Sequence, residues 1–528
     1  MKDLTDPKVL KLLSSTMSGS FKRQLINQEL KERRNKYSAR LSGFLAIMFF
    51  MSFITFGFQT VIAEISSSTG DLNNDRIINM SDVMILASVF NSVPGDGKYV
   101  LSYDLNSDGA INTSDIMIIA SRFNTVVSST PTATFIPTAT PTLTATSTPT
   151  TPATANKWVG TWGTSPQLVE SSNMPPSPGL SNNTLRQVVR VSIGGNQLRL
   201  KFSNEYGTSP LTMNSVHLAV SAGGNSIKSD TDKVLTFGGK ESVTIPAGKT
   251  VTSDTLDYAL PKMTNMAVTI YFGSTSSALT GHPGSRTTSY ILAGNKVNSS
   301  SMPSAVTTEH WYIITGIDVF TEDSYKAVVA LGDSITDGRG STTDGNNRWT
   351  DNLALRLQEN TATSKVAMLN QGVGGNTVLS GGLGPTALTR FDRDVLGQSG
   401  VRYLIILEGV NDIGSSSASS VATNLINAYK EFITKAHTKN ILVYGATILP
   451  FGGSQYDSTA HEQARQTVNS WIRTGGQFDA VIDFDAAVRN PNDQKKLLST
   501  YDSGDHLHPN AQGYKKMADI IDLTLLAE

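Results

Sequence analysis

The chain has 528 residues, with 43 basic and 44 acidic side chains and a formal net charge of −1 at pH 7. Such a length exceeds what one hydrophobic core organises, so two or more domains are expected. The balanced charge argues against a nucleic-acid partner. The chain has no cysteine, which excludes disulfides, thiolate nucleophiles and Cys-ligated zinc.

Residues 1–63 are predicted to be a basic segment followed by a signal peptide. Residues 1–40 carry ten Lys or Arg against four Asp or Glu. The apolar run 44–58 has the length of a secretory h-region and is short for a membrane span. Small residues at 61–63 offer a cleavage site, and Met17 is an alternative start. An uncleaved anchor is the alternative; either way we expect the rest of the chain to be extracellular.

Residues 71–91 and 104–124 are an internal repeat, because 14 of 21 positions are identical at an offset of 33. Each copy places oxygen-bearing side chains at positions 1, 3, 5, 9 and 12, the spacing of a twelve-residue calcium loop. One copy alone could be a solvated acidic turn, but two matching copies favour calcium. The expected ligands of the two structural ions are Asp71, Asn73, Asp75, Asn79 and Asp82 in the first copy, and Asp104, Asn106, Asp108, Asn112 and Asp115 in the second.

An apolar segment of helical length follows each loop, at 83–90 and 116–123. This arrangement resembles a type I dockerin, which we expect over residues 64–125. The resemblance implies that the chain binds a cohesin domain of a cellulosomal scaffoldin. Arg76 stands where such a loop usually has Gly, and Met80 departs from the Ser/Thr habit of the recognition positions.

Residues 126–156 are rich in Thr, Ser and Pro and are expected to form an extended spacer. Short alternating runs separated by Gly/Asn turns then predict a β-sandwich, jelly-roll-like, over 157–322. Trp158, Trp162 and Trp311 could stack on sugar or pack inside the fold, and no catalytic role is predicted for this region. The expected strands include 185–192, 198–202, 215–221, 241–245, 266–272 and 311–319.

Residues 323–528 alternate apolar runs with segments of helical length, the pattern of a three-layer α/β domain with a parallel sheet. We expect strands at 327–331, 366–369, 403–407, 441–444 and 480–484, and helices at 347–358, 420–435, 459–472 and after Pro509.

Four polar blocks fall at or after the expected strand ends, where α/β sheets bind their ligands. The blocks are Gly332–Ser334, Asn370–Thr377, Gly409–Asp412 and Asp505–Pro509. Gly-Asp-Ser alone could be an ordinary turn. The order and content of all four blocks resemble the SGNH (GDSL) hydrolases. The second Gly of the Gly-x-Ser-x-Gly elbow is missing, which argues against an ordinary α/β-hydrolase.

The blocks contain the groups that ester hydrolysis requires. The hydroxyl of Ser334 is a poor nucleophile unless a base accepts its proton, and His508 can be that base. Asp505, three residues before His508, can hold the other ring nitrogen. The resemblance implies that the backbone N–H groups of Ser334 and Gly375 and the side-chain amide of Asn411 form the oxyanion hole.

Other residues near these blocks have competing interpretations. His506 is an alternative base, although its spacing fits the family less well. Asp333 and Asp412 are expected to orient loops rather than transfer protons. Arg348 could shape the substrate cleft or pack inside the domain.

The combination predicts a secreted, cellulosome-associated serine esterase that removes acetyl groups from plant cell-wall polysaccharide of the xylan or pectin type, through an acyl-enzyme on Ser334. Catalysis is expected to need no cofactor. One alternative is a broad-specificity esterase acting on lipid or aryl esters. The other is a carbohydrate-binding protein with an inactive hydrolase domain.

Overall fold

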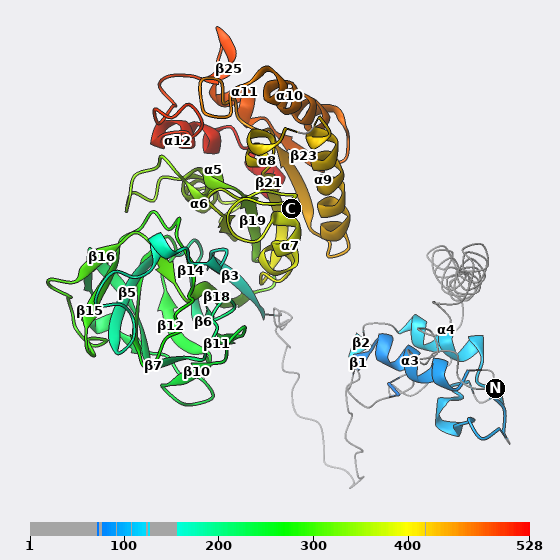
Figure 1. Ribbon diagram of the computed structural model, residues 1–528. Coiled ribbons are helices and arrows are strands. Elements are labelled where there is room, and N and C mark those ends of the chain that lie inside the picture. The colour runs from blue at the N-terminus through cyan, green and yellow to red at the C-terminus, as the bar shows by residue number, and fades with distance from the viewer. Residues whose placement is uncertain are drawn as a thin grey trace, which may run out of the picture. The chain divides into compact units, whose positions relative to one another are not determined.

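The computed structural model describes residues 71–72, 77–90, 92–94, 96–106, 108–122, 125–126, 156–417 and 419–527. The chain forms two compact units, 1–147 and 148–528 (Figure 1). The predicted basic segment and signal peptide, nearly all of the predicted spacer, and the predicted ligands Asn73 and Asp75 lie outside the described residues. Within those ranges, no helix combines the length and apolarity needed to cross a membrane.

The small unit is built from equivalent positions of the repeat. Its buried core consists of Ile78, Leu86, Ile111 and Ile119. The first two lie 33 residues before the last two, so both copies contribute the same pair of side chains. The described elements are helices α3 (Met80–Ser88) and α4 (Thr113–Ser121), and the antiparallel pair β1 (Ile77–Ile78) and β2 (Thr125–Val126).

Residues 156–322, here called the antiparallel domain, form two main antiparallel sheets whose buried side chains join one apolar core. The larger sheet has the order β10-β7-β13-β5-β15-β16 and the other β11-β6-β18-β3. Their strands are β3 (Asn156–Gly163), β5 (Asn183–Arg190), β6 (Gly195–Ser203), β7 (Leu211–Gly223), β10 (Val243–Ile245), β11 (Thr250–Thr252), β13 (Asn265–Phe272), β15 (Ser289–Ala293), β16 (Val306–Thr308) and β18 (Ile314–Glu322).

The expected strand 311–319 is two strands in different sheets. β17 (Trp311–Tyr312) pairs with β14 (Thr280–His282), whereas β18 pairs with β6 and β3. The break falls at Ile313, whose φ of 69° is incompatible with a continuous strand. Trp162 and Trp311 are only 8% and 5% exposed and meet edge to face, so both pack inside the fold.

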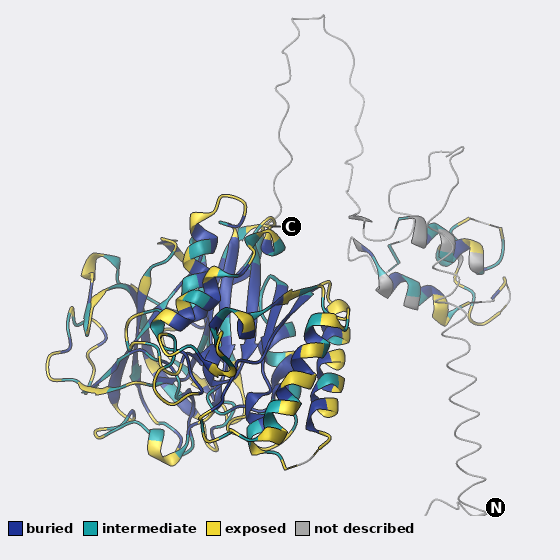
Figure 2. Cartoon of the chain, turned by 90° about the horizontal axis from the view of Figure 1, so that it is seen from above, coloured by how far each residue is buried: buried dark blue, intermediate teal, exposed yellow. Residues whose placement is uncertain are grey.

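Residues 326–527, here called the parallel domain, contain a parallel sheet of order β20-β19-β21-β22-β23. Helices α6 and α12 cover one face and α9 the other, and the sheet is buried between them (Figures 1 and 2). This confirms the expected fold class, although Phe484 begins a helix and not the end of a strand. The elements are β19 (Lys326–Gly332), α5 (Ser334–Asp337), α6 (Trp349–Glu359), β20 (Val366–Gly372), α7 (Ala387–Phe391), β21 (Val401–Leu407), α8 (Val410–Ser415), α9 (Val421–His437), β22 (Leu442–Ala446), α10 (Thr459–Thr474), β23 (Ala480–Ile482), α11 (Phe484–Val488) and α12 (Ala511–Asp519).

Strand β3 of the antiparallel domain packs closely on β20 of the parallel domain. A Cβ atom added to Gly160 would lie 2.9 Å from the side chain of Leu369, and one added to Gly163 would lie 3.0 Å from that of Gln371. The N–H of Gly160 donates to the carbonyl of Ser399 (2.9 Å). Backbone therefore meets side chain directly here, and a larger residue at either glycine would require the side chain of Leu369 or Gln371 to shift.

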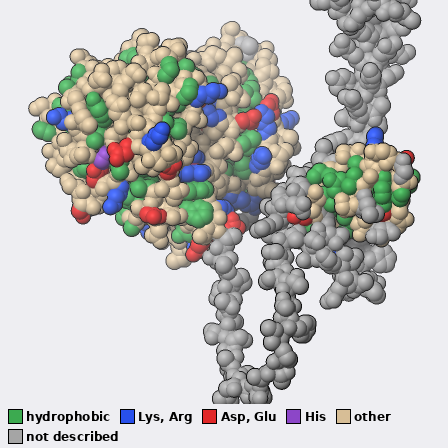
Figure 3. Space-filling model, turned by 90° about the horizontal axis from the view of Figure 1, so that it is seen from below, with side chains coloured by type: hydrophobic (Ala, Val, Ile, Leu, Met, Phe, Trp, Pro, Cys, Tyr) green, Lys and Arg blue, Asp and Glu red, His purple; other side chains and the backbone are tan. Residues whose placement is uncertain are grey.

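The surface of the larger unit carries charges of both signs. On the face shown in Figure 3, Lys and Arg side chains are interspersed with Asp and Glu. This mixture agrees with the near-zero net charge.

Candidate active site

The ends of three adjacent strands bring the predicted site residues together. Ser334 begins α5 directly after β19, and the side chain of Asp333 caps this helix by accepting the N–H of Ile335 (2.9 Å). Strands β19 and β21 are neighbours, and the chain leaves them in opposite directions along the sheet, from β19 to β20 on one side and from β21 to β22 on the other. Such a switch point opens a crevice at the carboxyl ends of the strands.

A chain of two hydrogen bonds joins the three predicted catalytic residues. The hydroxyl of Ser334 lies 2.8 Å from Nε2 of His508, and Nδ1 of the same ring lies 2.7 Å from Oδ2 of Asp505. The other oxygen of Asp505 accepts the N–H groups of Leu507 (3.0 Å) and His508 (2.9 Å). The carboxylate is therefore fixed by the same turn that presents the ring.

The electrostatics favour a neutral imidazole beside an ionised carboxylate. Burial lowers the pKa of His508 below its usual 6.5, against the opposing effect of Asp505. Burial raises the pKa of Asp505, but hydrogen bonds from the backbone and ring of His508 outweigh it and bring the pKa to about 2. At neutral pH, Nδ1–H therefore donates to Asp505, and Nε2 accepts the proton of the Ser334 hydroxyl.

The three predicted oxyanion donors, Ser334, Gly375 and Asn411, line one cleft. Among the described residues, the N–H groups of Ser334 and Gly375 donate to no other protein group. Gly375 has φ +70°, a conformation that glycine adopts without strain. The amide of Asn411 donates one N–H to the carbonyl of Asn376 (2.7 Å) and accepts the hydroxyl of Tyr456 (3.0 Å). These two bonds fix the amide and leave its second N–H for the cleft.

Two buried carboxylates hold the loops of the site. Asp412 accepts the N–H groups of Val378 (2.8 Å) and Leu379 (2.9 Å), which follow the Gly375 turn. Burial raises the pKa of Asp412, and burial together with the charge of Asp412 raises that of Asp333 to about 7. Both side chains act on backbone groups, as expected for residues that orient loops.

Arg390 is a positioning residue that the sequence analysis missed. Its side chain is fully buried. The guanidinium donates to the carbonyl of Gly332 at the end of β19 (2.9 Å), to that of Gln371 in β20 (2.7 Å) and to Glu408 just after β21 (3.0 Å). It also donates to the side chain of Asn376, next to Gly375 (3.0 Å). One cation thus ties together the three strand ends that carry the site.

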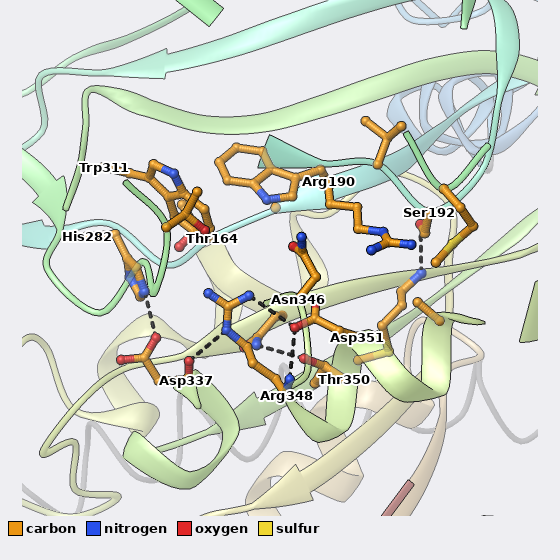
Figure 4. A pocket seen from close by; sticks show the side chains of 18 residues that line it. Thr164, Arg190, Ser192, His282, Trp311, Asp337, Asn346, Arg348, Thr350 and Asp351 are labelled. Carbon is orange, nitrogen blue, oxygen red and sulfur yellow. Dashed lines mark hydrogen bonds and ion pairs between the residues drawn. The ribbon is translucent and has the colours of Figure 1, made fainter. Parts of the chain in front are cut away.

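His282 is a second residue that the sequence analysis left without a role. It comes from the antiparallel domain and contacts Asp337, the last residue of α5, with 2.8 Å between Nε2 and Oδ1 (Figure 4). Its Nδ1 contacts the carbonyl of Ser165 (2.9 Å). Arg348, also drawn in Figure 4, donates to the carbonyl of Asp337 (2.9 Å). Arg348 therefore packs inside the fold, and both residues hold the helix that starts at Ser334.

The structure does not bring the alternative base to the hydroxyl. Nδ1 of His506 contacts Oδ2 of Asp502 (2.6 Å), and its side chain is 54% exposed. Its backbone has φ 61°, which turns the chain between Asp505 and Leu507.

The last carboxylates of the two calcium loops make equivalent contacts. Buried Asp82 accepts the N–H groups of Leu72 (2.7 Å) and Asn79 (2.8 Å). In the second copy, buried Asp115 accepts the N–H groups of the residues that correspond to Leu72 and Asn79, at 2.7 and 2.8 Å. Each carboxylate therefore closes its loop in the same way.

The second loop gathers oxygen atoms of the kind that calcium prefers. Asp108 accepts the side-chain amide of Asn106 (2.7 Å), and its N–H donates to Asp104 (3.1 Å). The side chain of Asn112 reaches the carbonyl of Ala110 (3.1 Å). In the part of the chain that the structure describes, no three Asp, Glu or His side chains cluster as a metal site by themselves. The loop would therefore need its Asn and carbonyl oxygens as well, and its all-oxygen set fits Ca²⁺.

The parallel sheet, with its polar loops at the carboxyl strand ends, defines an SGNH-like hydrolase domain. Residues 330–516 match the GDSL-like lipase/acylhydrolase family, and residues 69–124 match the dockerin type I domain. The chain therefore carries a GDSL-like hydrolase domain and a type I dockerin, as its sequence resemblances predict. No curated protein matches the chain.

Solved structures that resemble this chain cover a little over a third of it. One is assigned to the G-D-S-L lipolytic family of Desulfitobacterium hafniense (24% identity, 37% of this chain, 97% of that chain, TM-score 0.30). A GDSL-like lipase from Bacteroides thetaiotaomicron gives 20% identity over 38% and 87%, with a TM-score of 0.28. A catalytic mutant of an acetylxylan esterase from Geobacillus stearothermophilus gives 17% identity over 37% and 91%, with a TM-score of 0.30.

Proposed function

We propose that the chain is a secreted, cellulosome-associated serine esterase that removes acetyl groups from plant cell-wall polysaccharide of the xylan or pectin type. The observation that carries the proposal is the hydrogen-bonded chain from Ser334 through His508 to Asp505. In this arrangement an ionised carboxylate orients a neutral imidazole, and the imidazole accepts the proton of the serine hydroxyl. The hydroxyl is thereby activated for acyl transfer.

In the first step, Oγ of Ser334 attacks the ester carbonyl carbon while Nε2 of His508 takes the hydroxyl proton. The N–H groups of Ser334, Gly375 and Asn411 stabilise the oxyanion, and each such donor contributes about 10²–10³ in turnover. The intermediate collapses when the C–O bond to the sugar breaks and His508 returns the proton to the sugar oxygen. Acetyl remains on Ser334.

In the second step, water attacks the acetyl-enzyme. Nε2 of His508 takes a proton from water as the new C–O bond forms. Collapse breaks the bond to Oγ, which recovers the proton, and acetate leaves. Asp505 stays ionised throughout and stabilises the imidazolium that forms twice per cycle.

The dockerin would attach this activity to a scaffold. A type I dockerin binds a cohesin, which supports a cellulosomal, extracellular location. We assign the two structural calcium ions to the ten loop residues predicted from the repeat. When bound, calcium would neutralise the clustered carboxylates and fix the loops that precede α3 and α4.

Acetate release from acetylated xylan, mannan and pectin tests the proposal, with long-chain and aryl esters in parallel. The variant Ser334→Ala should lose activity on every ester. Ser364→Ala, at a half-buried serine just before β20, is the matched control. Full activity in Ser334→Ala would refute the mechanism. Faster hydrolysis of long-chain esters would favour the broad-specificity alternative, and polysaccharide retention without turnover would favour the inactive one.

A further inference from the structure

The antiparallel domain supplies one wall of the cleft that contains Ser334 and His508. The loop between β14 and β15 contributes Pro283, Gly284 and Arg286 to this wall. The cleft therefore belongs to both domains, and groups on this loop face any sugar bound at the serine.

Among the described residues, Arg190 and Arg286 are the two arginines whose Nε is buried without a hydrogen-bond partner, and only Arg286 of the two lines this cleft. Arg286 is half-buried. Across the described ranges, no carboxylate forms an ion pair with it. The fully buried Arg390 and Arg465, by contrast, are each paired with carboxylates. A partly desolvated cation without a counter-charge is costly unless a ligand supplies the charge.

The backbone of Arg286 is held in a strained conformation from both sides. Its φ is +50°, a conformation that is strained for a residue other than glycine. Its carbonyl accepts the N–H of Asp344 (3.0 Å), whose carboxylate accepts the N–H of Thr288 (2.7 Å). Arg348 donates to the carbonyl of Ser285 on the other side. The parallel domain thus fixes where this arginine projects, while its guanidinium has no protein partner.

The acidic groups of the cleft are already engaged by other side chains. Glu170 accepts the amides of Gln167 (2.6 Å) and Asn173 (2.9 Å). Asp337 contacts His282, and Asp505 contacts His508. Burial and then the charges of Arg339 and Arg286 lower the pKa of His508 against the effect of Asp505, so Arg286 acts within electrostatic reach of the site.

We propose that Arg286 binds the carboxylate of a uronic acid residue in the polysaccharide, beside the acetylated sugar. A guanidinium presents two parallel N–H groups that match the two oxygens of a carboxylate. This inference rests on the proposed function and narrows its substrate to acidic polysaccharide. Arg286 is then a specificity-determining residue that the antiparallel domain supplies.

The test compares each acidic polymer with its neutral counterpart. Acetylated pectin and acetylated glucuronoxylan are assayed for kcat/KM before and after reduction of their carboxyl groups. The wild type should prefer the acidic form of at least one polymer by about 10-fold to 100-fold at low salt, and salt should reduce the preference. Arg286→Gln should bring the ratio near one, and Arg286→Lys should give an intermediate ratio.

Arg402→Gln is the matched control, because it removes the same charge at the opposite end of the sheet, in β21, and should keep the wild-type ratio. An equal kcat/KM for the acidic and the carboxyl-reduced forms of both polymers would overturn the inference. The proposed esterase activity would still stand. A wild-type ratio retained by Arg286→Gln would overturn it as well. A different result would refute the proposed function itself, namely full ester hydrolysis by the variant Ser334→Ala.

Discussion

Replacing Arg390 with Met should destabilise the larger unit strongly, because Met has nearly the same length but none of the five donors. The buried carboxyl of Glu408 and the carbonyl of Gln371 would lose the guanidinium as a donor. The carbonyl of Gly332 would lose it too but would keep the N–H of Val373. Breaking a buried ion pair from one side costs about 3–5 kcal/mol. This is a large part of the 5–15 kcal/mol that typically separates folded from unfolded domains.

The same change should lower the activity of the molecules that remain folded. Arg390 joins the ends of β19, β20 and β21, so its loss frees Ser334, Gly375 and Asn411 to shift relative to one another. A displacement of about 1 Å in a catalytic group can cost roughly 10²-fold in rate. We therefore expect a fall of about 10-fold to 100-fold in kcat below the unfolding transition.

Urea unfolding and hydrolysis of p-nitrophenyl acetate measure the two effects. The double variant Arg390→Met with Glu408→Gln should recover part of the stability, because the buried carboxyl left without Arg390 is replaced by a neutral amide. Arg402→Gln should stay within about 0.5 kcal/mol of the wild type. A loss below about 1 kcal/mol in Arg390→Met, or no recovery in the double variant, would refute the reasoning.

Three further predictions concern protons and calcium. Because burial lowers the pKa of His508, kcat/KM should rise with pH through a midpoint below 6.5. It should then level off, because Asp505, with a pKa of about 2, stays ionised. A midpoint above 7 in a pH–rate profile would contradict this. Asp333 has a pKa of about 7 in the folded state and near 3.9 in the unfolded state. Between these two pH values the folded state binds the extra proton, so the stability of the fold falls as pH rises from about 3.9 to about 7. Asp333→Asn keeps an acceptor for the N–H of Ile335 and should reduce this fall in urea midpoints between pH 5 and pH 8; an unchanged slope would count against it. Chelation of calcium should abolish cohesin binding, measured by calorimetry, and spare ester hydrolysis, because the assigned ions lie within residues 71–115; loss of both activities would contradict separate sites.

The sequence predicts the parts of the fold that local patterns encode. Apolar runs located the strands of the parallel sheet to within a few residues, and polar blocks located the loops after them. These patterns work because a buried strand must be apolar along its length and the chain must turn where it ends. The blocks that contain Ser334, His508 and Asp505, which the structure joins by hydrogen bonds, were located for the same reason, since they stand at strand ends and turns.

Contacts between distant segments were not predictable in this way. In the sequence, Arg390 is one more charged residue of a short helix. Only the folded sheet reveals that its guanidinium donates to the carbonyls of Gly332 and Gln371 and to the side chain of Glu408, at the ends of three strands. His282 meets Asp337 from a different domain, so neither local sequence contains the pairing. The break at Ile313 also escaped, because alternation continues through 311–319 while the backbone changes sheets.

Gly160 and Gly163, where β3 packs on β20, determine which parts of this chain can be exchanged for those of another protein. At the spacer, a dockerin could be exchanged for another appendage without disturbing any described contact of the larger unit. Between the antiparallel and parallel domains such an exchange would disturb the packing, because a foreign strand with a side chain at Gly160 would require Leu369 to shift. Natural or engineered recombination should therefore transfer residues 156–527 together, as one unit.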